Sequence, residues 1–575
     1  MGWEQIYEQW KNHQQLEAGL KDQLTELEKD PEMLQDAFYM PLEFGTAGMR
    51  GILGPGINRM NIYTVRQATE GLARFMDTQD PETRRRGVAI AYDSRHFSPE
   101  FAMEAAKTLA KHDIPAFVFE SLRPTPELSF AVRYLHTFTG IMITASHNPA
   151  AYNGHKVYGE DGGQMPPADA DALTAFVREI ENPLEIPVLS EEEAKHSGLI
   201  TIIGEEVDTA YLKEVKTVTI DQKLIETTGK NLKLVYTPLH GTGRMLGEKA
   251  LKQAGFEQFI IEPSQAVADP NFSTVKSPNP EEHSAFEYAI ALGEKEDADL
   301  LIATDPDADR LGAAVRMPDG NYQVLTGNQL GALMIRYILE AHKNAGTLPE
   351  NAAVLKSIVS SELPTAIAQS YDVEMVNVLT GFKFIAEKIQ QYETDHSHTF
   401  MFGFEESYGY LVKPFVRDKD AIQALVLLAE VAAFYKQSDK TLYDGLQDIF
   451  EEYGYYAEKT ISVTMSGMEG AAKITALMKT FREKAPSVFA GIPVVQTEDF
   501  KELTRVGLDG HMQKMTTPPS DVLKYTLEDE SWIAVRPSGT EPKIKFYIGV
   551  KGNSSEDAAN KIAELEAAIN EITEV

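Results

Sequence analysis

The sequence predicts an α/β protein with about three related α/β domains and a C-terminal α+β domain. Three observations lead to this prediction. The chain has 575 residues, which is more than one hydrophobic core usually organises. Short β-rich runs alternate with helical stretches over most of its length, which is typical of mixed or parallel sheets built from βαβ units. From Thr460 onward this regular alternation stops.

A helical pattern opens the chain. Apolar residues such as Ile6, Trp10 and Leu20 recur at near-helical spacing between Trp3 and about Lys29, so we expect an N-terminal packing helix that ends before Asp30-Pro31. The β-rich runs that follow predict strands at Val88–Tyr92, Ala116–Phe119, Ile141–Thr144, Leu232–Tyr236, Phe259–Ile261, Leu300–Ala303, Ala353–Val359, Val373–Val378 and Phe400–Phe402.

The sequence of the C-terminal region predicts a different arrangement of strands and helices. We expect its β runs, Ile461–Met465, Val494–Gln496, Trp532–Val535 and Ile544–Val550, to be joined by two helical stretches. A final helix should begin after Ser554-Ser555 and place Ile562, Leu565, Ile569 and Ile572 on one face. The predicted domains are residues 1–206, 207–321, 322–456 and 457–575.

Composition narrows the classes of function. There are no cysteines, so a metal site would use oxygen or imidazole ligands. The formal charge of −33 argues against nucleic-acid binding, and no stretch approaches the ~20 apolar residues of a membrane span. The start, Met1-Gly2-Trp3, resembles no secretory signal, so we expect a cytoplasmic protein. If such an acidic chain binds an anion, it must gather cations locally.

The first candidate motif is Thr144-Ala145-Ser146-His147-Asn148-Pro149, directly after an apolar run. Loops after the carboxyl ends of strands are where ligands bind in open α/β sheets. Ser146 with His147 offers a nucleophile beside a base or electrostatic partner. Taken alone, the same residues also fit an ordinary strand-to-turn transition. The segment lacks the G-x-S-x-G elbow of an α/β-hydrolase.

The second motif is Asp305-Pro306-Asp307-Ala308-Asp309-Arg310. Three carboxylates at alternating positions after a strand suit Mg²⁺. An EF-hand is excluded, because Arg310 and Arg316 stand where Gly and Glu are needed. A haloacid-dehalogenase-type phosphatase with Asp305 as nucleophile, or a solvated acidic turn, stays an alternative at this point.

Two further loops carry polar groups suited to a phosphorylated sugar. Arg536-Pro537-Ser538-Gly539-Thr540-Glu541-Pro542-Lys543 could cradle a phosphate, although a plain hairpin is the alternative. Gly403-Phe404-Glu405-Glu406-Ser407-Tyr408-Gly409 could accept hydrogen bonds from sugar hydroxyls, unless the two acids are a surface pair. Cations fall inside or beside such loops at Arg50, Arg95, Lys156, Arg310, Lys383, Lys419, Arg536 and Lys543.

Together, T-A-S-H-N-P at 144–149, D-P-D-A-D-R at 305–310, E-E-S-Y-G at 405–409 and R-P-S-G-T-E-P at 536–542 resemble the α-D-phosphohexomutase superfamily. The resemblance spans roughly residues 40–550 and implies a phosphohexomutase-like four-domain architecture, with three related α/β domains and a fourth on another plan. It also implies an isomerase that moves a phosphoryl group within a sugar phosphate.

The resemblance implies a role for each matching residue. Ser146 would be the phosphoserine, and Asp305, Asp307 and Asp309 would hold Mg²⁺ with one of its oxygens. His147 and Arg310 would stabilise the transferring phosphoryl group, and Lys156 would be the general acid/base. The implied substrate contacts are Arg50, Thr380, Gly381, Glu405, Ser407, Lys419, Arg536, Ser538, Gly539 and Thr540.

The E-E-S-Y-G loop looks most like the glucose-phosphate branch. The resemblance therefore implies a phosphoglucomutase that interconverts glucose 1-phosphate and glucose 6-phosphate through glucose 1,6-bisphosphate. Phe404 replaces the Gly commonly found before the two acids, so ribose or mannose phosphates stay alternatives. The implied partner is a small-molecule sugar phosphate, with no nucleic acid and no membrane, and the protein could be a monomer or a homodimer.

Overall fold

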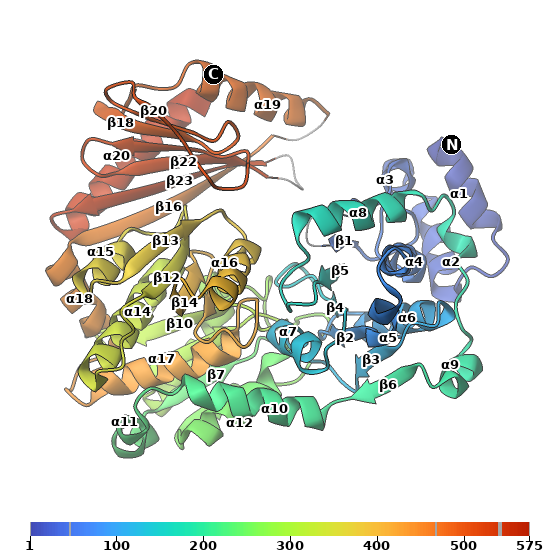
Figure 1. The fold of residues 1–575 in the computed structure, drawn as a ribbon, viewed down its shortest axis with the longest axis horizontal. Coiled ribbons are helices and arrows are strands. Elements are labelled where there is room, and N and C mark those ends of the chain that lie inside the picture. The colour runs from blue at the N-terminus through green and yellow to red at the C-terminus, as the bar shows by residue number, and fades with distance from the viewer. Residues whose placement is uncertain (1, 45–47, 466–467, 539–542, 574–575) are drawn as a thin grey trace. The chain divides into compact units, whose positions relative to one another are not determined.

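In the computed structural model, the residues described are 2–44, 48–465, 468–538 and 543–573. The chain groups into two compact units (Figure 1). The first comprises residues 1–327, 385–403 and 407–441, and the second comprises residues 328–384, 404–406 and 442–575. The proposed domain boundaries near 206, 321 and 456 stay a prediction.

The first unit contains a six-stranded mixed sheet. Four of its strands are parallel, in the order β4 (Thr139–Ile143), β2 (Val88–Tyr92), β3 (Ala116–Phe119) and β6 (Ile200–Ile203). On the other side of β4, β5 (Tyr152–Tyr158) pairs antiparallel with β4, and β1 (Gly48–Ile52) pairs antiparallel with β5. Every residue of β2 and β4 is buried, as continuous apolar strands in a covered sheet should be. The helices are α4 (Ile62–Asp77), α5 (Pro81–Arg86), α6 (Ser98–Lys111), α7 (Thr125–Tyr134), α8 (Pro167–Arg178) and α9 (Glu191–Ser197).

A second mixed sheet of the first unit has the order β11 (Tyr322–Val324), β10 (Leu311–Arg316), β9 (Leu300–Thr304), β7 (Leu234–Thr237) and β8 (Phe259–Ile261). Its last three strands are parallel, and β10 and β11 are antiparallel. Its helices are α10 (Glu205–Val215), α11 (Gln222–Thr227), α12 (Gly243–Ala254) and α13 (Glu287–Glu296). The apolar helix α17 (Ala421–Lys436) packs against α12 and is capped by Asp420.

The second unit contains the parallel pair β12 (Ala352–Ser357) and β13 (Glu374–Val378). Helices α14 (Gly327–Ala345), α15 (Leu363–Ser370) and α18 (Leu442–Tyr453) belong to the same region of sequence. The chain passes between the units within α16 (Phe382–Asp395) and within β14 (Thr399–Glu405), which is followed by β15 (Gly409–Leu411).

The second unit ends in a fully antiparallel sheet (Figure 1). Its order is β16 (Tyr455–Thr464), β23 (Lys543–Gly552), β22 (Trp532–Pro537), β21 (Leu523–Leu527), β18 (Ile492–Asp499), β19 (Thr504–Gly507) and β20 (Met512–Lys514), with β17 (Val488–Phe489) beside β18. Helices α19 (Met468–Glu483) and α20 (Ser555–Thr573) share one core with the sheet, to which Phe481, Tyr525, Phe546 and Leu565 contribute. The predicted final helix is confirmed.

Two secondary-structure predictions are wrong. The N-terminal helix is two helices, α1 (Trp3–Asn12) and α2 (Ala18–Leu27), followed by α3 (Pro31–Tyr39). The Tyr63 hydroxyl lies 3.1 Å from both the Gln15 carbonyl oxygen and the Glu17 nitrogen, and these hydrogen bonds fix the turn that separates α1 from α2. In the C-terminal region, α19 is the one helix between β16 and β23 among the residues that are described, because the segment after β18 forms β19, β20 and β21.

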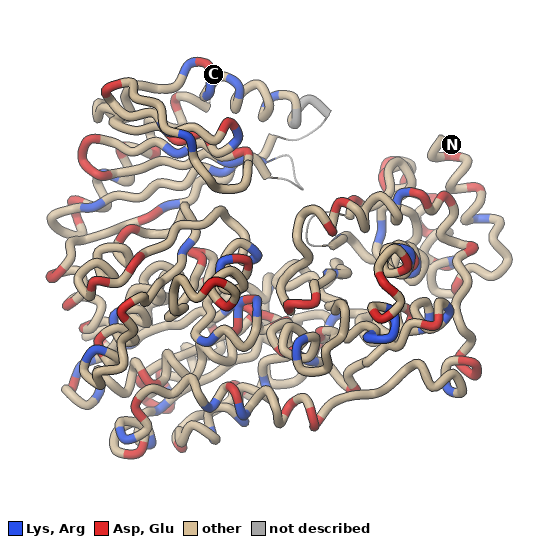
Figure 2. Tube along the Cα trace, viewed as in Figure 1, with Lys and Arg blue, Asp and Glu red and all other residues tan. Residues whose placement is uncertain are grey.

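Asp and Glu residues are spread along the chain in both units (Figure 2). Within the described ranges, no helix combines the length and the apolar composition that a bilayer span needs.

His155 is a fully buried titratable group in the middle of β5. It lies opposite Met49 of β1 and Ile143 of β4, and its ring packs near Phe44. Its Nε2 is 3.3 Å from the Thr69 hydroxyl, whereas its Nδ1 has no hydrogen-bond partner in the described part of the chain. Burial lowers the pKa of His155 to about 4, so the folded protein holds this ring neutral.

We expect His155 to make the protein less stable in mild acid. The unfolded chain takes up this proton near pH 6.5 and the folded chain only near pH 4, so stability is lost as the pH falls between these values, by up to about 1.4 kcal/mol per pH unit. Urea unfolding of His155→Gln at several pH values should show a shallower dependence by about that amount. Equal slopes for the two proteins would contradict the assignment.

Candidate active site

Ser146 stands in the loop after β4 with a left-handed backbone, φ 52°. Such a conformation costs a residue other than Gly about 1–3 kcal/mol and persists where its surroundings fix it. The Ser146 N–H donates to the Thr144 hydroxyl at 2.8 Å. Its own hydroxyl donates to Asp305 Oδ2 at 2.9 Å and lies 3.2 Å from His147 Nδ1. The first two predicted motifs therefore meet at Ser146.

Arg95 holds the loop that contains Ser146 through hydrogen bonds to its backbone. Its guanidinium donates to the carbonyl oxygens of Ser146, Asn148, Pro149 and Tyr152, and it forms an ion pair with Asp93 at 3.2 Å. The side chain is fully buried. Arg95 was expected among the cations placed for an anion, but these contacts commit it to the backbone of the loop.

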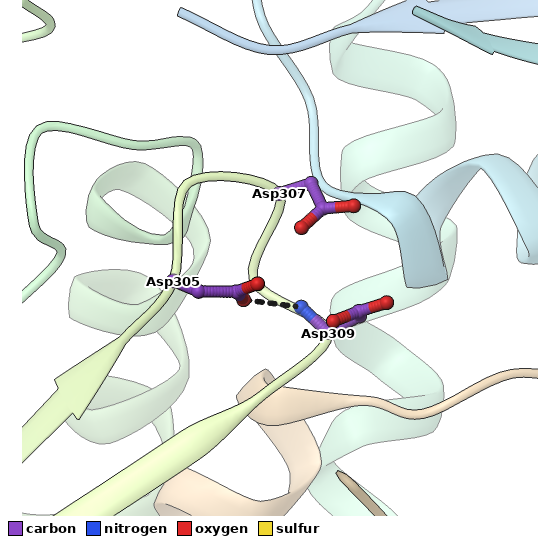
Figure 3. A group of neighbouring side chains, drawn as sticks. All are labelled: Asp305, Asp307 and Asp309. Carbon is purple, nitrogen blue, oxygen red and sulfur yellow. Dashed lines mark hydrogen bonds between the residues drawn. The ribbon is translucent and has the colours of Figure 1, made fainter. Parts of the chain in front are cut away.

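Asp305, Asp307 and Asp309 follow β9 in the turn to β10, and all three are buried. Their carboxylates converge, with one oxygen of each within 4.8 Å of the others (Figure 3). Asp305 Oδ1 accepts the N–H groups of Asp309 and Arg310 at 3.1 and 3.0 Å. Asp307 Oδ1 and Asp309 Oδ1 have no hydrogen-bond partner within the described residues. Buried carboxylate oxygens without donors are costly, and a divalent cation would satisfy them.

The pKa values of this cluster reflect burial and mutual repulsion. Burial, followed by the charges of Asp307 and Asp309, raises the pKa of Asp305 well above its usual range. Burial also acts to raise the pKa of Asp307, but the neighbouring Lys156 ammonium and hydrogen bonds outweigh it, so that pKa is lowered. Asp307 is thus held ionised by its donors.

Four predicted cations lie around Ser146 and the aspartates. Lys156 Nζ is 3.1 Å from Asp307 Oδ2, and Lys419 Nζ is 3.1 Å from Asp309 Oδ2. A Cβ at Gly409 would collide with the Lys419 side chain, which explains the Gly of the E-E-S-Y-G loop. Arg310 bonds Glu281 at 2.8 Å and the Ser407 carbonyl oxygen at 3.0 Å, and the exposed Arg50 bonds Asn148 at 3.0 Å.

His147 is the neutral partner in this group. Burial, followed by the charge of Arg310, lowers its pKa well below the usual range. The ring can therefore take part in hydrogen bonds near the Ser146 hydroxyl without adding a second positive charge to those of Arg310 and Lys156.

The second unit holds the other predicted contacts. Glu405 is 6% exposed and its Oε1 accepts the Gly381 N–H at 2.7 Å, while the buried Thr380 hydroxyl oxygen has no hydrogen-bond partner in the described part of the chain. Burial, followed by the charge of Glu406, raises the pKa of Tyr547 to about 12, and the nearby Arg536 acts in the opposite direction. Of the remaining predicted contacts, Ser538 ends the described part of its loop, and Gly539 and Thr540 lie outside the described residues.

Comparison with known proteins identifies the relatives of this chain. Four family models, described as phosphoglucomutase/phosphomannomutase alpha/beta/alpha domains I, II and III and C-terminal domain, match residues 41–184, 209–318, 326–453 and 488–569. A phosphoglucomutase of Staphylococcus aureus is 42% identical over 531 residues, covering 92% of this chain and 93% of that protein. The chain belongs to the phosphoglucomutase/phosphomannomutase family.

Solved structures agree with the fold of this family. A family protein from Burkholderia thailandensis aligns with a TM-score of 0.65 at 16% identity, covering 93% of this chain and 98% of that one. The open form of the Paramecium phosphoglucomutase pp63/parafusin aligns with a TM-score of 0.67 at 17% identity, covering 93% and 96%. The predicted superfamily and the fold class are confirmed.

Family membership makes the chain an enzyme, a mutase of the isomerase class. The dehalogenase-type phosphatase that the Asp-x-Asp pattern left open is not the family of this protein.

Thr125 is a site residue that the sequence analysis missed. It is the first residue of α7, and its N–H and hydroxyl donate to the backbone oxygen and to Oδ2 of Asp307, both at 2.9 Å. Oδ2 thus has two donors, Thr125 and Lys156, whereas Oδ1 has no hydrogen-bond partner in the described chain. The signal was present in Arg123-Pro124-Thr125-Pro126, where prolines fix a helix start after β3.

We expect Thr125→Val to weaken binding of a divalent cation about tenfold, because the isosteric side chain cannot donate to Asp307 Oδ2 and the carboxylate loses its fixed rotamer. Calorimetric titration with Mg²⁺ would measure this directly, without turnover. Thr125→Ser keeps the hydroxyl and should bind Mg²⁺ within about twofold of the unaltered protein. Equal affinity for the Val variant would show that Thr125 does not position this ligand.

Proposed function

We propose that this mutase is a phosphoglucomutase that interconverts α-D-glucose 1-phosphate and glucose 6-phosphate. The observation that carries the proposal is the Ser146 hydroxyl 2.9 Å from Asp305 in a buried cluster of three aspartates. The identity of 42% with a phosphoglucomutase along nearly the whole of both chains supports glucose phosphate as the substrate.

In the proposed cycle, phosphorylated Ser146 gives its phosphoryl group to a hydroxyl of the sugar monophosphate. The P–Oγ bond breaks and a P–O bond to the sugar forms. The sugar hydroxyl gives its proton to a base, and the Ser146 Oγ that leaves takes up a proton to become a hydroxyl. The product of this half-reaction is glucose 1,6-bisphosphate, which returns its other phosphoryl group to Ser146 after reorienting. Positioning and charge neutralisation carry most of the catalysis in such transfers.

Asp305, Asp307 and Asp309, with Ser146, would hold Mg²⁺, and the two carboxylate oxygens without donors fit a hard cation. When bound, Mg²⁺ supplies positive charge against the phosphoryl oxygens. Arg310 and neutral His147 would stabilise the same group from the protein side.

Lys156 would move the proton. Burial acts to lower its pKa, but Asp307 and Asp309 outweigh this effect and the pKa is raised, so the ammonium form is favoured. When the bisphosphate returns a phosphoryl group to Ser146, the sugar oxygen leaves, and Lys156 would donate the proton that this oxygen takes up. In the opposite direction it would receive that proton.

The sugar and its second phosphate need groups outside the aspartate cluster. Glu405 and Ser407 would accept hydrogen bonds from sugar hydroxyls, with Thr380, Gly381, Arg50 and Lys419 as further contacts. The phosphate that is not being transferred would be held by Arg536, Ser538, Gly539 and Thr540. A location in the cytoplasm and a monomeric or dimeric state belong to the same proposal.

Phe404 bears on the choice of sugar. Its side chain is fully buried, and a Cβ at Gly331 would lie 2.9 Å from the Phe404 ring. The residue therefore packs beneath the loop and leaves Glu405 and its neighbours to contact the sugar. The unusual residue is therefore part of the packing, and its presence does not argue against glucose phosphate.

We expect Ser146→Ala to lower turnover by at least about 10³-fold while the protein stays folded, because the acceptor of the phosphoryl group is removed. The unaltered enzyme, isolated in active form, should carry one phosphoryl group on the peptide that contains Ser146, as intact-mass and peptide analysis would show. The control variant Ser197→Ala, at the half-buried C-terminal end of α9 and outside the candidate site, should keep both activity and phosphate. A fully active Ser146→Ala enzyme would refute the mechanism.

We expect the kcat/KM for α-D-glucose 1-phosphate to exceed those for mannose 1-phosphate and ribose 1-phosphate in parallel assays with the matching bisphosphate added. Glu405→Gln should lower kcat/KM for glucose 1-phosphate about 10–100-fold, because a neutral acceptor replaces a charged one at the sugar hydroxyls. Phosphorylation of Ser146 should be unaffected in this variant. Higher efficiency with ribose or mannose phosphate would overturn the choice of sugar and leave the phosphoserine mechanism standing.

A further inference from the structure

Glu406 has no role in the proposed cycle, although it stands between the two residues proposed to contact the sugar. Its side chain is half-buried, and its Oε2 accepts the Ser357 hydroxyl at 2.7 Å. The Ser360 hydroxyl oxygen lies 3.2 Å from the same Oε2 and 2.9 Å from the Ser357 hydroxyl oxygen, and it accepts the Glu406 N–H at 3.1 Å. Both the side chain and the backbone of Glu406 are therefore bound to one pair of serines.

The two serines lie on a well-fixed stretch of backbone. Ser357 is the last residue of β12, Ser360 lies in the turn that follows, and both side chains are fully buried. The Ser360 N–H donates to the Ser357 carbonyl oxygen at 3.0 Å, and the Ser360 carbonyl oxygen accepts the buried Lys356 ammonium at 3.3 Å. Lys356 also pairs with Glu362 at 3.1 Å. The backbone that carries the two hydroxyls is thus held by contacts that do not involve Glu406.

The residues between the two serines fasten this turn to its neighbours. Ile358 and Val359 belong to one buried cluster with Trp532 of β22. The Ile358 N–H donates to the Val378 carbonyl oxygen at 2.8 Å, and the Ile358 carbonyl oxygen accepts the Lys524 ammonium at 2.8 Å. The turn after β12 is therefore fixed both to the end of β13 and to the C-terminal sheet.

The carboxylate of Glu405 is fixed at the end of the adjacent strand. Ser357 of β12 and Val378 of β13 are opposite each other and are the last residues of these two parallel strands. Glu405 accepts the N–H of Gly381, three residues after Val378, at 2.7 Å. Loops after the carboxyl ends of parallel strands are where ligands bind. Glu405 and Glu406 are thus attached to two neighbouring loops of one ligand-binding edge.

The two acids have different surroundings and therefore different uses. Hydrogen bonds to an ionised carboxylate are among the strong ones, so the buried serine hydroxyls hold the orientation of Glu406. Because Glu405 directly precedes Glu406 in the chain, a displacement of the Glu406 backbone also displaces Glu405. A shift of about 1 Å in a group that positions a substrate can lower the rate about 10²-fold.

We propose that Ser357 and Ser360 are positioning residues for the sugar. They hold Glu406, and Glu406 fixes the backbone from which Glu405 reaches the sugar hydroxyls. Of the two adjacent acids, Glu405 contacts the sugar and Glu406 anchors the loop. This inference rests on the proposed function, because the role of Glu405 belongs to it.

The test is a set of variants at Ser357 and Glu406 of the full-length enzyme. We expect Ser357→Ala to raise the KM for glucose 1-phosphate about 5–10-fold with kcat within about twofold, because a sugar contact is weakened while Ser146 and the aspartates are unchanged. Glu406→Ala should raise KM at least as much. In the Glu406→Ala background, Ser357→Ala should change KM by less than about twofold, because the serine acts through this carboxylate.

Glu406→Gln is the conservative variant. Its amide oxygen can still accept the Ser357 hydroxyl, so KM should stay within about threefold of that of the unaltered enzyme. Because Glu406 is only half-buried, its variants test the anchor even where a serine variant is unstable. Thermal melting of every variant separates a loss of folded protein from a change in KM.

The matched control is Ser361→Ala in the same turn. Ser361 is also buried, but its hydroxyl oxygen accepts the Leu363 N–H at 3.2 Å, so its removal should leave KM within about twofold. An unchanged KM in Glu406→Ala, an equal rise in Ser361→Ala, or additive effects of Ser357→Ala and Glu406→Ala would overturn the anchoring role. If Glu405→Gln still lowers kcat/KM, only this inference fails, whereas an unaffected Glu405→Gln enzyme would count against the proposed sugar site itself.

Discussion

The arrangement around Ser146 depends on the electrostatic cost of burying three carboxylates together. Asp305, Asp307 and Asp309 are removed from water within a few ångströms of one another, in a protein that is already strongly acidic. Unpaired buried charges of one sign are among the most unfavourable features a fold can contain. The surrounding side chains offset part of that electrostatic cost.

Each hydrogen-bond donor around the three aspartates offsets part of the cost of burying them. Lys156 and Thr125 saturate Asp307 Oδ2, Lys419 pairs with Asp309 Oδ2, and the Ser146 hydroxyl binds Asp305 Oδ2. The protein satisfies one side of each carboxylate and leaves Oδ1 of Asp307 and Asp309 without donors. The compensation is therefore incomplete at these two oxygens, which a divalent cation would satisfy.

The same loops show what the sequence could predict and what it could not. Ser146 and the aspartates were predicted because their spacing after apolar strands is local information, and buried parallel strands such as β2 read as continuous apolar runs. Thr125 was missed because its partner is 182 residues away, and only the tertiary fold brings the start of α7 to the metal loop. The break between α1 and α2 was missed for the same reason, since it is fixed by the distant Tyr63.

Arg95 shows the limit most clearly. In sequence it is a cation beside a polar loop, as Arg50 and Lys156 are, and composition cannot distinguish the three. In the fold, Arg95 is fully buried and bonds four carbonyl oxygens, Arg50 is exposed beside Asn148, and Lys156 faces a carboxylate. The positions of cations in the sequence therefore indicate which loops carry anions or carboxylates. Their burial in the fold decides whether a cation binds backbone carbonyl oxygens, pairs with a carboxylate or stays accessible to a ligand.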